Sequence, residues 1–355
     1  MRKKCPLIFG TMILRIKRPQ KLQSKLLGST KCASILPEGR EQRGLAKPTK
    51  RASATFERHC GQSCINIPVW SQCLSKRSFN SKVFAKYRGR IAPTPSGFLH
   101  VGHAQTFKEA WTRACNANGK IILRIEDIDE ARTRPEYVSQ IYADLKKIGI
   151  DWDEGPDIGG EFAPYIQSER KEFYWETLNR LRAKNLVYPC NASRAQIKEL
   201  SKKSAYSAEG CEIETIFPQS LRPQKFEEPK NPREINWRFR VPDGRKITFT
   251  DAIVGEQTFT AGEDFGDFIV WKKSNEPSYD LAVVADDIAM EITEVVRGRD
   301  LLLATAKQIL LYEALDANPP TFAHCPLMTH DDGNKLSKSV LKNQADNPFL
   351  IKNLS

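Results

Sequence analysis

The sequence predicts a doubly wound α/β fold, in which helices cover both faces of a parallel sheet. Segment 89–92 is typical of a short strand and runs into a Pro/Ser/Gly loop, after which a helical pattern extends from about 103 to 118 and ends at Gly119. A continuous apolar run, 121–125, then has the character of a buried parallel strand. A second helical pattern begins at Pro135. Strands that alternate with helices in this way favour a parallel sheet.

The helix that begins at Pro135 is amphipathic. Its apolar residues recur at spacings of three, four and seven, which places them on one helical face, and Gly149 ends it. Further along, we expect a hairpin whose strands, 237–241 and 246–250, are joined by the turn 242–244. The other expected elements are helices at 173–186 and 301–315, buried strands at 268–271 and 281–284, and a small inserted domain at about 188–235.

Residues 1–86 differ in composition from the rest of the chain. They carry 19 Lys and Arg against 3 Asp and Glu, whereas residues 87–355 have a net charge of −4. This basic, acid-poor segment is typical of a transit peptide for a mitochondrion or plastid, or of an uncleaved disordered arm on a cytoplasmic protein. Its apolar stretch 7–14 is too short to span a membrane, so we expect no membrane association.

Two short motifs more than 230 residues apart indicate nucleotide chemistry without a P-loop. The first, 95–103, places His100 and His103 at the start of a helix, where imidazole groups can donate to phosphate oxygens. The second, Lys335-Leu336-Ser337-Lys338-Ser339, places two lysines in a polar loop after a Gly-containing turn. Either motif alone is commonly a helix cap or a solvated basic loop. The two together favour ATP binding.

Several segments resemble one enzyme family. Residues 90–103 and 123–129 resemble the catalytic domain of the class I glutamyl-tRNA synthetases, and residues 278–287 and 294–300 are similar to the shorter glutamyl-queuosine tRNA(Asp) synthetases within it. The resemblance covers about residues 88–345. It implies a Rossmann-type catalytic core that activates L-glutamate with ATP and Mg²⁺. It also implies transfer of the glutamate to tRNA, specifically to queuosine in the anticodon of tRNA(Asp).

The resemblance assigns roles to the residues of the two motifs. It implies that His100, His103, Lys335 and Lys338 are catalytic. It also implies that Gly102 binds ATP together with His100, His103 and Lys338. We expect Lys338 to contact the ATP phosphates and the departing pyrophosphate, with Lys335 assisting.

A dicarboxylic amino acid needs cations for its carboxylates and an anion for its ammonium group. Arg90 and Arg297 can form forked contacts with carboxylates, and Glu126 can pair with the ammonium group. Any one of these side chains would ordinarily belong to a structural ion pair, but their joint match to the family favours substrate binding. The resemblance implies a glutamate site made of Arg90, Ala92, Thr94, Glu126, Tyr279 and Arg297.

Zinc binding is the weakest part of the resemblance. Members of the family often hold zinc in the inserted domain through Cys-x-Cys followed by a Tyr and a Cys. Here Cys190 keeps the first position, Ala192 replaces the second Cys, and Tyr206 and Cys211 are the remaining candidates. Three ligands are fewer than the four of a closed structural site, so we expect packing rather than zinc to hold the insertion.

We expect a monomer with a catalytic domain at 87–345, a short tail at 346–355 and no anticodon-binding domain. Two alternatives stay open. One is a divergent organellar glutamyl-tRNA synthetase that charges the tRNA 3′ end, although such enzymes continue into an anticodon-binding region. The other is a non-catalytic relative that binds tRNA or protein, although the intact histidine and lysine motifs argue against it.

Overall fold

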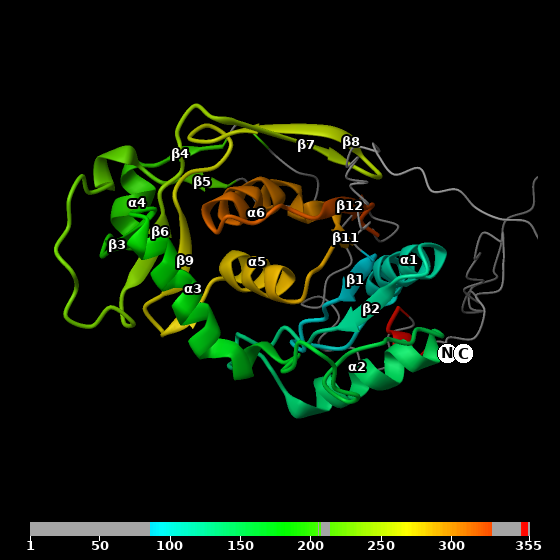
Figure 1. Cartoon of the computed structure of the whole chain (residues 1–355). Coiled ribbons are helices and arrows are strands. Elements are labelled where there is room, and N and C mark those ends of the chain that lie inside the picture. Colours follow the sequence, from blue (N-terminus) through cyan, green and yellow to red (C-terminus); the bar gives the residue numbers. More distant parts are fainter. Residues whose placement is uncertain (1–85, 205, 207–213, 329–348, 354–355) are drawn as a thin grey trace, which may run out of the picture. The chain divides into compact units, whose positions relative to one another are not determined.

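The computed structural model describes residues 86–204, 206, 214–328 and 349–353 (Figure 1). They belong to one compact unit, Val83–Ser355. Strand β1 (Arg88–Ile91) pairs in parallel with β2 (Lys120–Leu123), and helix α1 (Val101–Asn116) connects them. The crossover from strand to helix to parallel strand is the expected α/β unit.

Two further parallel strands extend this layer. Strand β11 (Glu294–Gly298) pairs in parallel with β12 (Thr321–Cys325). Thr293, just before β11, donates its backbone N–H to the Arg88 carbonyl at 2.9 Å, which brings β11 alongside β1. Adjacent residues of β11 and β12 point into different apolar clusters, because Val296 and Ala323 pack with α1 whereas Val295 and Phe322 pack with the helices of the opposite side. The prediction of a doubly wound fold is confirmed.

Helices cover both sides of the parallel strands. Helix α2 (Pro135–Lys147) packs with α1 and the strands through Ile141 and Leu145. Helices α5 (Tyr279–Ala289) and α6 (Leu302–Ala314) lie side by side on the other side (Figure 1). A second, antiparallel sheet has the order β10-β9-β6-β3 and packs with α3 (Lys171–Ala183) and α5. Its strands are β3 (Val187–Cys190), β6 (Asn236–Phe239), β9 (Phe268–Lys272) and β10 (Glu276–Pro277).

The expected hairpin at 237–250 is wrong. Strand β6 pairs with β3 and β9, whereas β7 (Lys246–Asp251) pairs with β8 (Gly255–Thr260) and, through Asp251, with β12. The Pro-Asp-Gly segment therefore joins two different sheets. A turn signal predicts that the chain reverses direction, but it does not decide which strands then pair.

The expected strand at 281–284 is also wrong, because these residues lie inside α5. The Ser278 hydroxyl accepts the Leu281 backbone N–H at 3.2 Å and begins the helix. All residues from Leu281 to Asp287 are buried, so the helix has no solvent-exposed face in this stretch. A continuous apolar run cannot distinguish a buried strand from a buried helix.

The stretch predicted to be an insertion, 188–235, contains few regular elements. Its described part holds most of β3, helix α4 (Arg194–Leu200), the short strands β4 (Lys202–Lys203) and β5 (Thr215–Ile216), and a 3₁₀ turn at Gln219–Leu221. A small cluster of Tyr188, Cys190 and Phe217 packs here. Strand β3 joins the antiparallel sheet, so this segment is anchored on the β6 edge.

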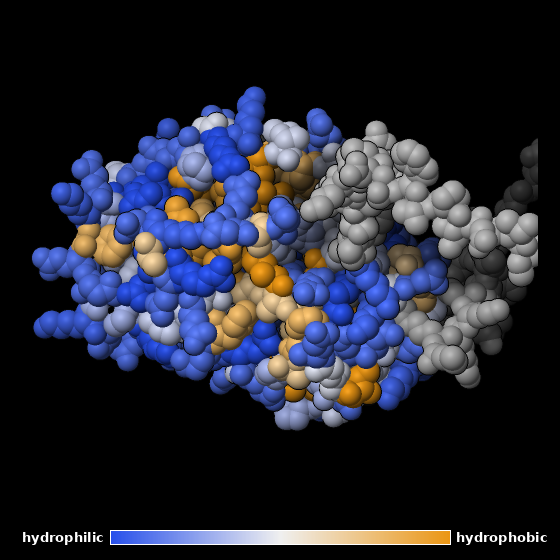
Figure 2. All heavy atoms as spheres, in the orientation of Figure 1, coloured by the Kyte–Doolittle hydropathy of each residue, from blue (hydrophilic) through white to orange (hydrophobic). Residues whose placement is uncertain are grey.

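A helix that spans a membrane requires a minimum length and a high hydropathy. None of the helices that the structure describes is long and apolar enough to cross a bilayer. On the face seen in Figure 2, hydrophilic side chains predominate and hydrophobic ones gather toward the middle.

Glu154 links the first two strands through a buried charge cluster. Arg88 of β1 donates two hydrogen bonds of 3.1 Å to it, and Lys120 of β2 and the Tyr165 hydroxyl each donate one of 2.7 Å. Burial opposes ionisation, but these donors outweigh it and lower the pKa of Glu154 to about 2. Its contribution to stability is therefore complete above the unfolded pKa of about 4.3 and is lost as pH falls toward 2.

We expect Glu154→Gln to lower the free energy of unfolding by about 3 kcal/mol at pH 7, because Arg88 then stays buried without its anion. Urea unfolding of the full chain measures this loss. Glu172→Gln is the matched control, because Glu172 pairs with Arg233 at an exposed position and its loss should leave stability nearly unchanged. Equal effects of the two substitutions would contradict the assignment.

Candidate active site

A cavity of about 470 Å³ is lined by the predicted glutamate- and ATP-binding residues that the structure describes. It opens where parallel strands end: Arg90 lies near the end of β1 and Ala92 just after it, Glu126 comes after β2, and Arg297 is near the end of β11. Ligands of doubly wound folds bind at this edge of the sheet. The nine described candidates that share the cavity are Arg90, Ala92, Thr94, His100, Gly102, His103, Glu126, Tyr279 and Arg297. Lys335 and Lys338 lie outside the described residues.

His100 and His103 cap the start of α1. The backbone N–H of Gly102 donates to His100 Nδ1, and the backbone N–H of His100 donates to His103 Nδ1, each at 3.2 Å. A nitrogen that accepts a hydrogen bond carries no proton, so in the neutral rings the proton is on Nε2. The two rings lie with centroids 3.8 Å apart. The helix cap therefore leaves Nε2–H as the donor of each ring.

Gly102 allows the His100 ring to lie against the backbone. A β-carbon at position 102 would be 3.0 Å from His100 Cε1 and 3.1 Å from Nδ1, closer than side chains ordinarily approach. The absence of a side chain at Gly102 thus explains how this capping arrangement fits at the cavity wall.

Arg297 is buried and has contacts on one side of its guanidinium. Its Nη2 donates to the Thr305 hydroxyl at 2.8 Å and its Nε donates to His324 Nε2 at 3.2 Å. Nη1 is buried without a hydrogen-bond partner among the described residues. An unpaired guanidinium nitrogen in a cavity wall is suited to bind a carboxylate.

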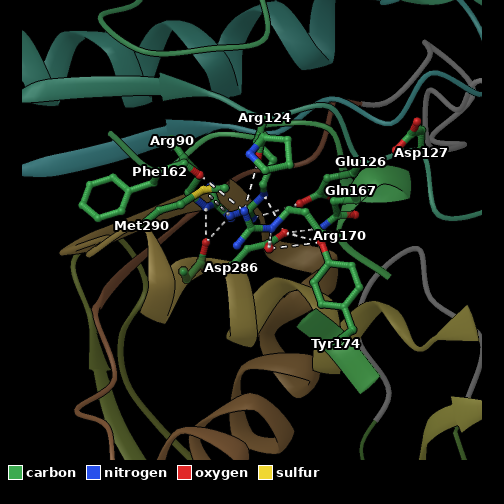
Figure 3. Close-up of polar contacts among 12 residues, drawn as sticks. Arg90, Arg124, Glu126, Asp127, Phe162, Gln167, Arg170, Tyr174, Asp286 and Met290 are labelled. Atoms are coloured by element: carbon green, nitrogen blue, oxygen red, sulfur yellow. Dashed lines mark hydrogen bonds and ion pairs between the residues drawn. The ribbon is translucent and has the colours of Figure 1, made fainter. Parts of the chain in front are cut away.

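Arg90 and Glu126 belong to a buried charge cluster (Figure 3). Arg90 donates through Nη1 to the Val296 carbonyl at 2.8 Å, and its Nε lies 3.9 Å from Asp287 Oδ1. Arg124, which is fully buried, donates to Glu126 Oε1 at 3.1 Å and to Asp287 Oδ1 at 2.7 Å. Burial raises the pKa of Glu126, although Arg124 and Arg90 oppose this shift. Arg124 and Asp287 thus connect the two oppositely charged side chains of the cavity, Glu126 and Arg90.

Asp286 extends the cluster away from the cavity. Its carboxylate accepts from Gln167 at 2.8 Å, from Arg170 Nε at 2.8 Å and from the Tyr174 hydroxyl at 2.9 Å, and it lies 3.6 Å from Arg124 Nε. Figure 3 shows Asp286 between Arg124 and the Arg170–Tyr174 pair. The full cluster holds three arginines and three carboxylates: Arg90, Arg124, Arg170, Glu126, Asp286 and Asp287. It is therefore balanced in charge.

Sequence reasoning missed Arg124, Asp286, Asp287 and His324. The first lies within an apolar run and the two aspartates lie within an apolar helix, where a charge must find a partner. That signal was available in the sequence. The partners were not, because Arg124 and Asp287 are 163 positions apart.

The described zinc candidates pack in different apolar clusters. Cys190 packs with Tyr188 and Phe217, whereas the Tyr206 ring lies against Phe259 with centroids 4.9 Å apart. Cys211 lies outside the described residues. Across the described ranges, no group of three or more His, Cys, Asp or Glu could hold a metal ion.

Comparison with known proteins identifies the family of the fold and its cavity. The model of the class I tRNA synthetase (E and Q) catalytic domain matches residues 86–348. A glutamyl-Q tRNA(Asp) synthetase of Symbiobacterium thermophilum is 47% identical over 70% of this chain and 77% of its own length. The corresponding protein of Nitratidesulfovibrio vulgaris is 42% identical over 71% and 77%.

Longer relatives match over a smaller share of their length. A glutamate–tRNA ligase of Caldicellulosiruptor saccharolyticus is 39% identical, and the match covers 71% of this chain but 52% of the ligase. The crystal structure of a glutamate tRNA ligase from Elizabethkingia meningosepticum superposes with a TM-score of 0.61 at 28% identity, covering 75% of this chain and 54% of that one. The chain belongs to the class I tRNA synthetases of the glutamyl and glutaminyl group, of which it contains the catalytic domain.

Proposed function

We propose that this protein activates L-glutamate with ATP and transfers it to tRNA, the acceptor being queuosine in the anticodon of tRNA(Asp). The observation that carries the proposal is the composition of one cavity. Two buried arginines and a buried glutamate line the same cavity as a pair of histidines whose donors are set by a helix cap. Such a cavity has cations for two carboxylates, an anion for an ammonium group and donors for phosphate oxygens.

In the proposed first step, an α-carboxylate oxygen of glutamate attacks the α-phosphorus of ATP. The bond from this phosphorus to the bridging oxygen breaks, and pyrophosphate leaves with the electron pair. His100 and His103 would donate from Nε2 to phosphate oxygens as charge develops there. We propose that Lys335 and Lys338 bind the phosphates from the other side. Mg²⁺ bound to the ATP phosphates would neutralise part of their charge, and its other ligands would be mainly water.

Glutamate is held in this proposal by complementary charges. Arg297 would bind one carboxylate through Nη1, Arg90 would face the other, and Glu126 would accept the ammonium group. Tyr279, Ala92 and Thr94 line the remaining wall. In the second step, a hydroxyl of the acceptor would attack the activated carbonyl carbon. The bond from this carbon to the phosphate oxygen would break, AMP would leave with the electron pair, and the hydroxyl proton would pass to a phosphate oxygen.

The relatives support the proposed acceptor. The two that are named for glutamyl-Q transfer match over 77% of their length, whereas the glutamate–tRNA ligase of C. saccharolyticus matches over 52%. We also propose a monomeric catalytic domain at 87–345 that includes the insertion at 188–235. The basic segment that precedes this domain, 1–86, would serve as a mitochondrial or plastid transit sequence.

Glutamate-dependent exchange of labelled pyrophosphate into ATP tests the activation step on the full chain. We expect exchange without tRNA, since the family resemblance implies tRNA-independent activation for glutamyl-Q enzymes. Exchange only with tRNA would favour a glutamyl-tRNA synthetase that charges the 3′ end. No exchange in either condition would favour a non-catalytic relative.

Transfer of labelled glutamate distinguishes the two acceptors. We expect labelling of tRNA(Asp) that contains queuosine, including a preparation without its 3′-terminal adenosine, and no labelling of tRNA(Asp) that lacks queuosine. Loss of labelling upon removal of the terminal adenosine would overturn the queuosine assignment.

A further inference from the structure

Behind Arg297 lies a buried pair of residues that does not line the cavity. His324 of β12 is fully buried, and its Nδ1 lies 2.6 Å from Asp251 Oδ2, at the end of β7. Its other ring nitrogen, Nε2, accepts from Arg297 Nε at 3.2 Å and also lies 3.1 Å from the Thr305 hydroxyl oxygen. Asp251, His324 and Arg297 thus form a chain of contacts from the β7–β8 connection to the cavity wall.

The contacts of Asp251 determine the protonation of His324. Asp251 Oδ1 accepts three backbone N–H groups, those of Ile253 at 2.9 Å, Val254 at 3.0 Å and His324 at 3.1 Å. Burial opposes ionisation, but His324 and these backbone donors lower the pKa of Asp251 to about 2. An ionised carboxylate can only accept, so the proton between the two side chains is on His324 Nδ1.

His324 is therefore a neutral ring with a lone pair on Nε2. Burial lowers its pKa, although the hydrogen bond to Asp251 opposes this shift. The lone pair faces Arg297 Nε. The hydroxyl oxygen of Thr305, in α6, accepts a hydrogen bond from Arg297 Nη2. These two contacts fix the plane of the guanidinium and leave Nη1 as its unpaired nitrogen among the described residues.

We propose that Asp251 and His324 are positioning residues, which orient the Arg297 guanidinium so that Nη1 binds a carboxylate of the amino-acid substrate. The proposal rests on the glutamate binding proposed above. Asp251 acts without touching the substrate: it selects the tautomer of His324 that can accept from Arg297. A protonated Nε2 could donate only to the Thr305 hydroxyl, 3.1 Å away, and would face Arg297 Nε as a second donor, so the Arg297 contact would be lost.

The substitution Asp251→Asn tests this role with almost no change of shape. The three backbone donors would hold the amide oxygen at the Oδ1 position, so the amide NH₂ would face His324 Nδ1. His324 must then accept at Nδ1 and carry its proton on Nε2, opposite Arg297 Nε. We expect the KM for glutamate in pyrophosphate exchange to rise about tenfold or more, with the KM for ATP unchanged.

The matched control is to repeat Asp251→Asn in a chain that also carries His324→Gln. The glutamine amide oxygen can reach the position of Nε2 and accept from Arg297, and this acceptor does not depend on a ring tautomer. We expect the KM of His324→Gln for glutamate to stay within about threefold of the wild type, and Asp251→Asn to add little in this background. An equal rise of the KM in both backgrounds, or no rise in either, would overturn the proposal. If the unsubstituted chain shows no exchange, the proposed function itself fails.

The tautomer can also be read without any substitution. In ¹⁵N-histidine spectra of the full chain, we expect the buried His324 ring to carry its proton on Nδ1 and to have an unprotonated Nε2 at pH 7. A signal from Nε2–H at His324 would overturn the proposal even if every variant failed to fold.

Discussion

His103→Asn is expected to lower kcat for pyrophosphate exchange by about 10²- to 10³-fold, the loss typical of removing one donor from a charge-stabilising site. The substitution keeps an oxygen near the position of Nδ1, where the His100 backbone N–H can still donate to it. It removes Nε2–H, which the helix cap leaves as the donor of this ring. The cap and the proposed catalytic role are thereby separated.

Stability measurements decide between these two roles. If His103 serves only as a cap, His103→Asn should leave exchange nearly unchanged, while His103→Ala should lower the free energy of unfolding by about 1 kcal/mol. We expect the asparagine variant to keep its stability and lose its activity. Gln105→Ala, at an exposed position in the same turn of α1, is the control and should change neither quantity. A fully active asparagine variant would contradict the assignment.

The sequence predicted the candidate site better than it predicted the strand pairing. Nine of the proposed residues line one cavity. Most of their motifs lie at the ends of parallel strands, which meet at one edge of the sheet; Tyr279, at the start of α5, is the exception. Arg90, Glu126 and Arg297 were predicted because they match the family's glutamate-binding positions and because their charges complement a dicarboxylic amino acid. Lys335 and Lys338 stay predictions, since they lie outside the described residues.

Strand pairing depends on contacts between residues that are distant in the sequence, and local sequence patterns carry no information about such contacts. The turn 242–244 was located correctly as a break in the chain, but β6 found its partners in β3 and β9. The apolar run 281–284 had no period that would separate helix from strand, and Ser278, which caps the helix, lies outside it.

The residues that support the site were missed for a related reason. Asp251 and His324 are 73 positions apart, and neither lies in a motif. His324 can contact Arg297 only because β12 pairs with β11 in the register that places these two residues next to each other. A single buried charge could be predicted from the sequence, but its partner could not.

Arg124→Met is expected to lower the free energy of unfolding by about 3–5 kcal/mol at pH 8, because it removes the central cation of a buried cluster. Glu126, Asp286 and Asp287 would then share two arginines, and both contacts of Arg124 with Asp287 and Glu126 would be lost. Methionine keeps much of the side-chain volume, so a cavity contributes little to this loss. Arg124→Lys, which keeps the charge but not the fork, should fall between the methionine variant and the wild type.

The pH dependence of this loss distinguishes charge from packing. Burial raises the pKa of Glu126 and of Asp286, with Arg124 opposing the shift for both, so its removal raises the two values further. A carboxyl whose pKa is higher in the folded state binds its proton there first, and folding then gains stability as pH falls. The deficit of Arg124→Met should therefore be smaller at pH 5.5 than at pH 8 in urea unfolding. An equal deficit at both pH values would mean that Arg124 acts through packing, and the balanced cluster would not be what holds Glu126 at the cavity wall.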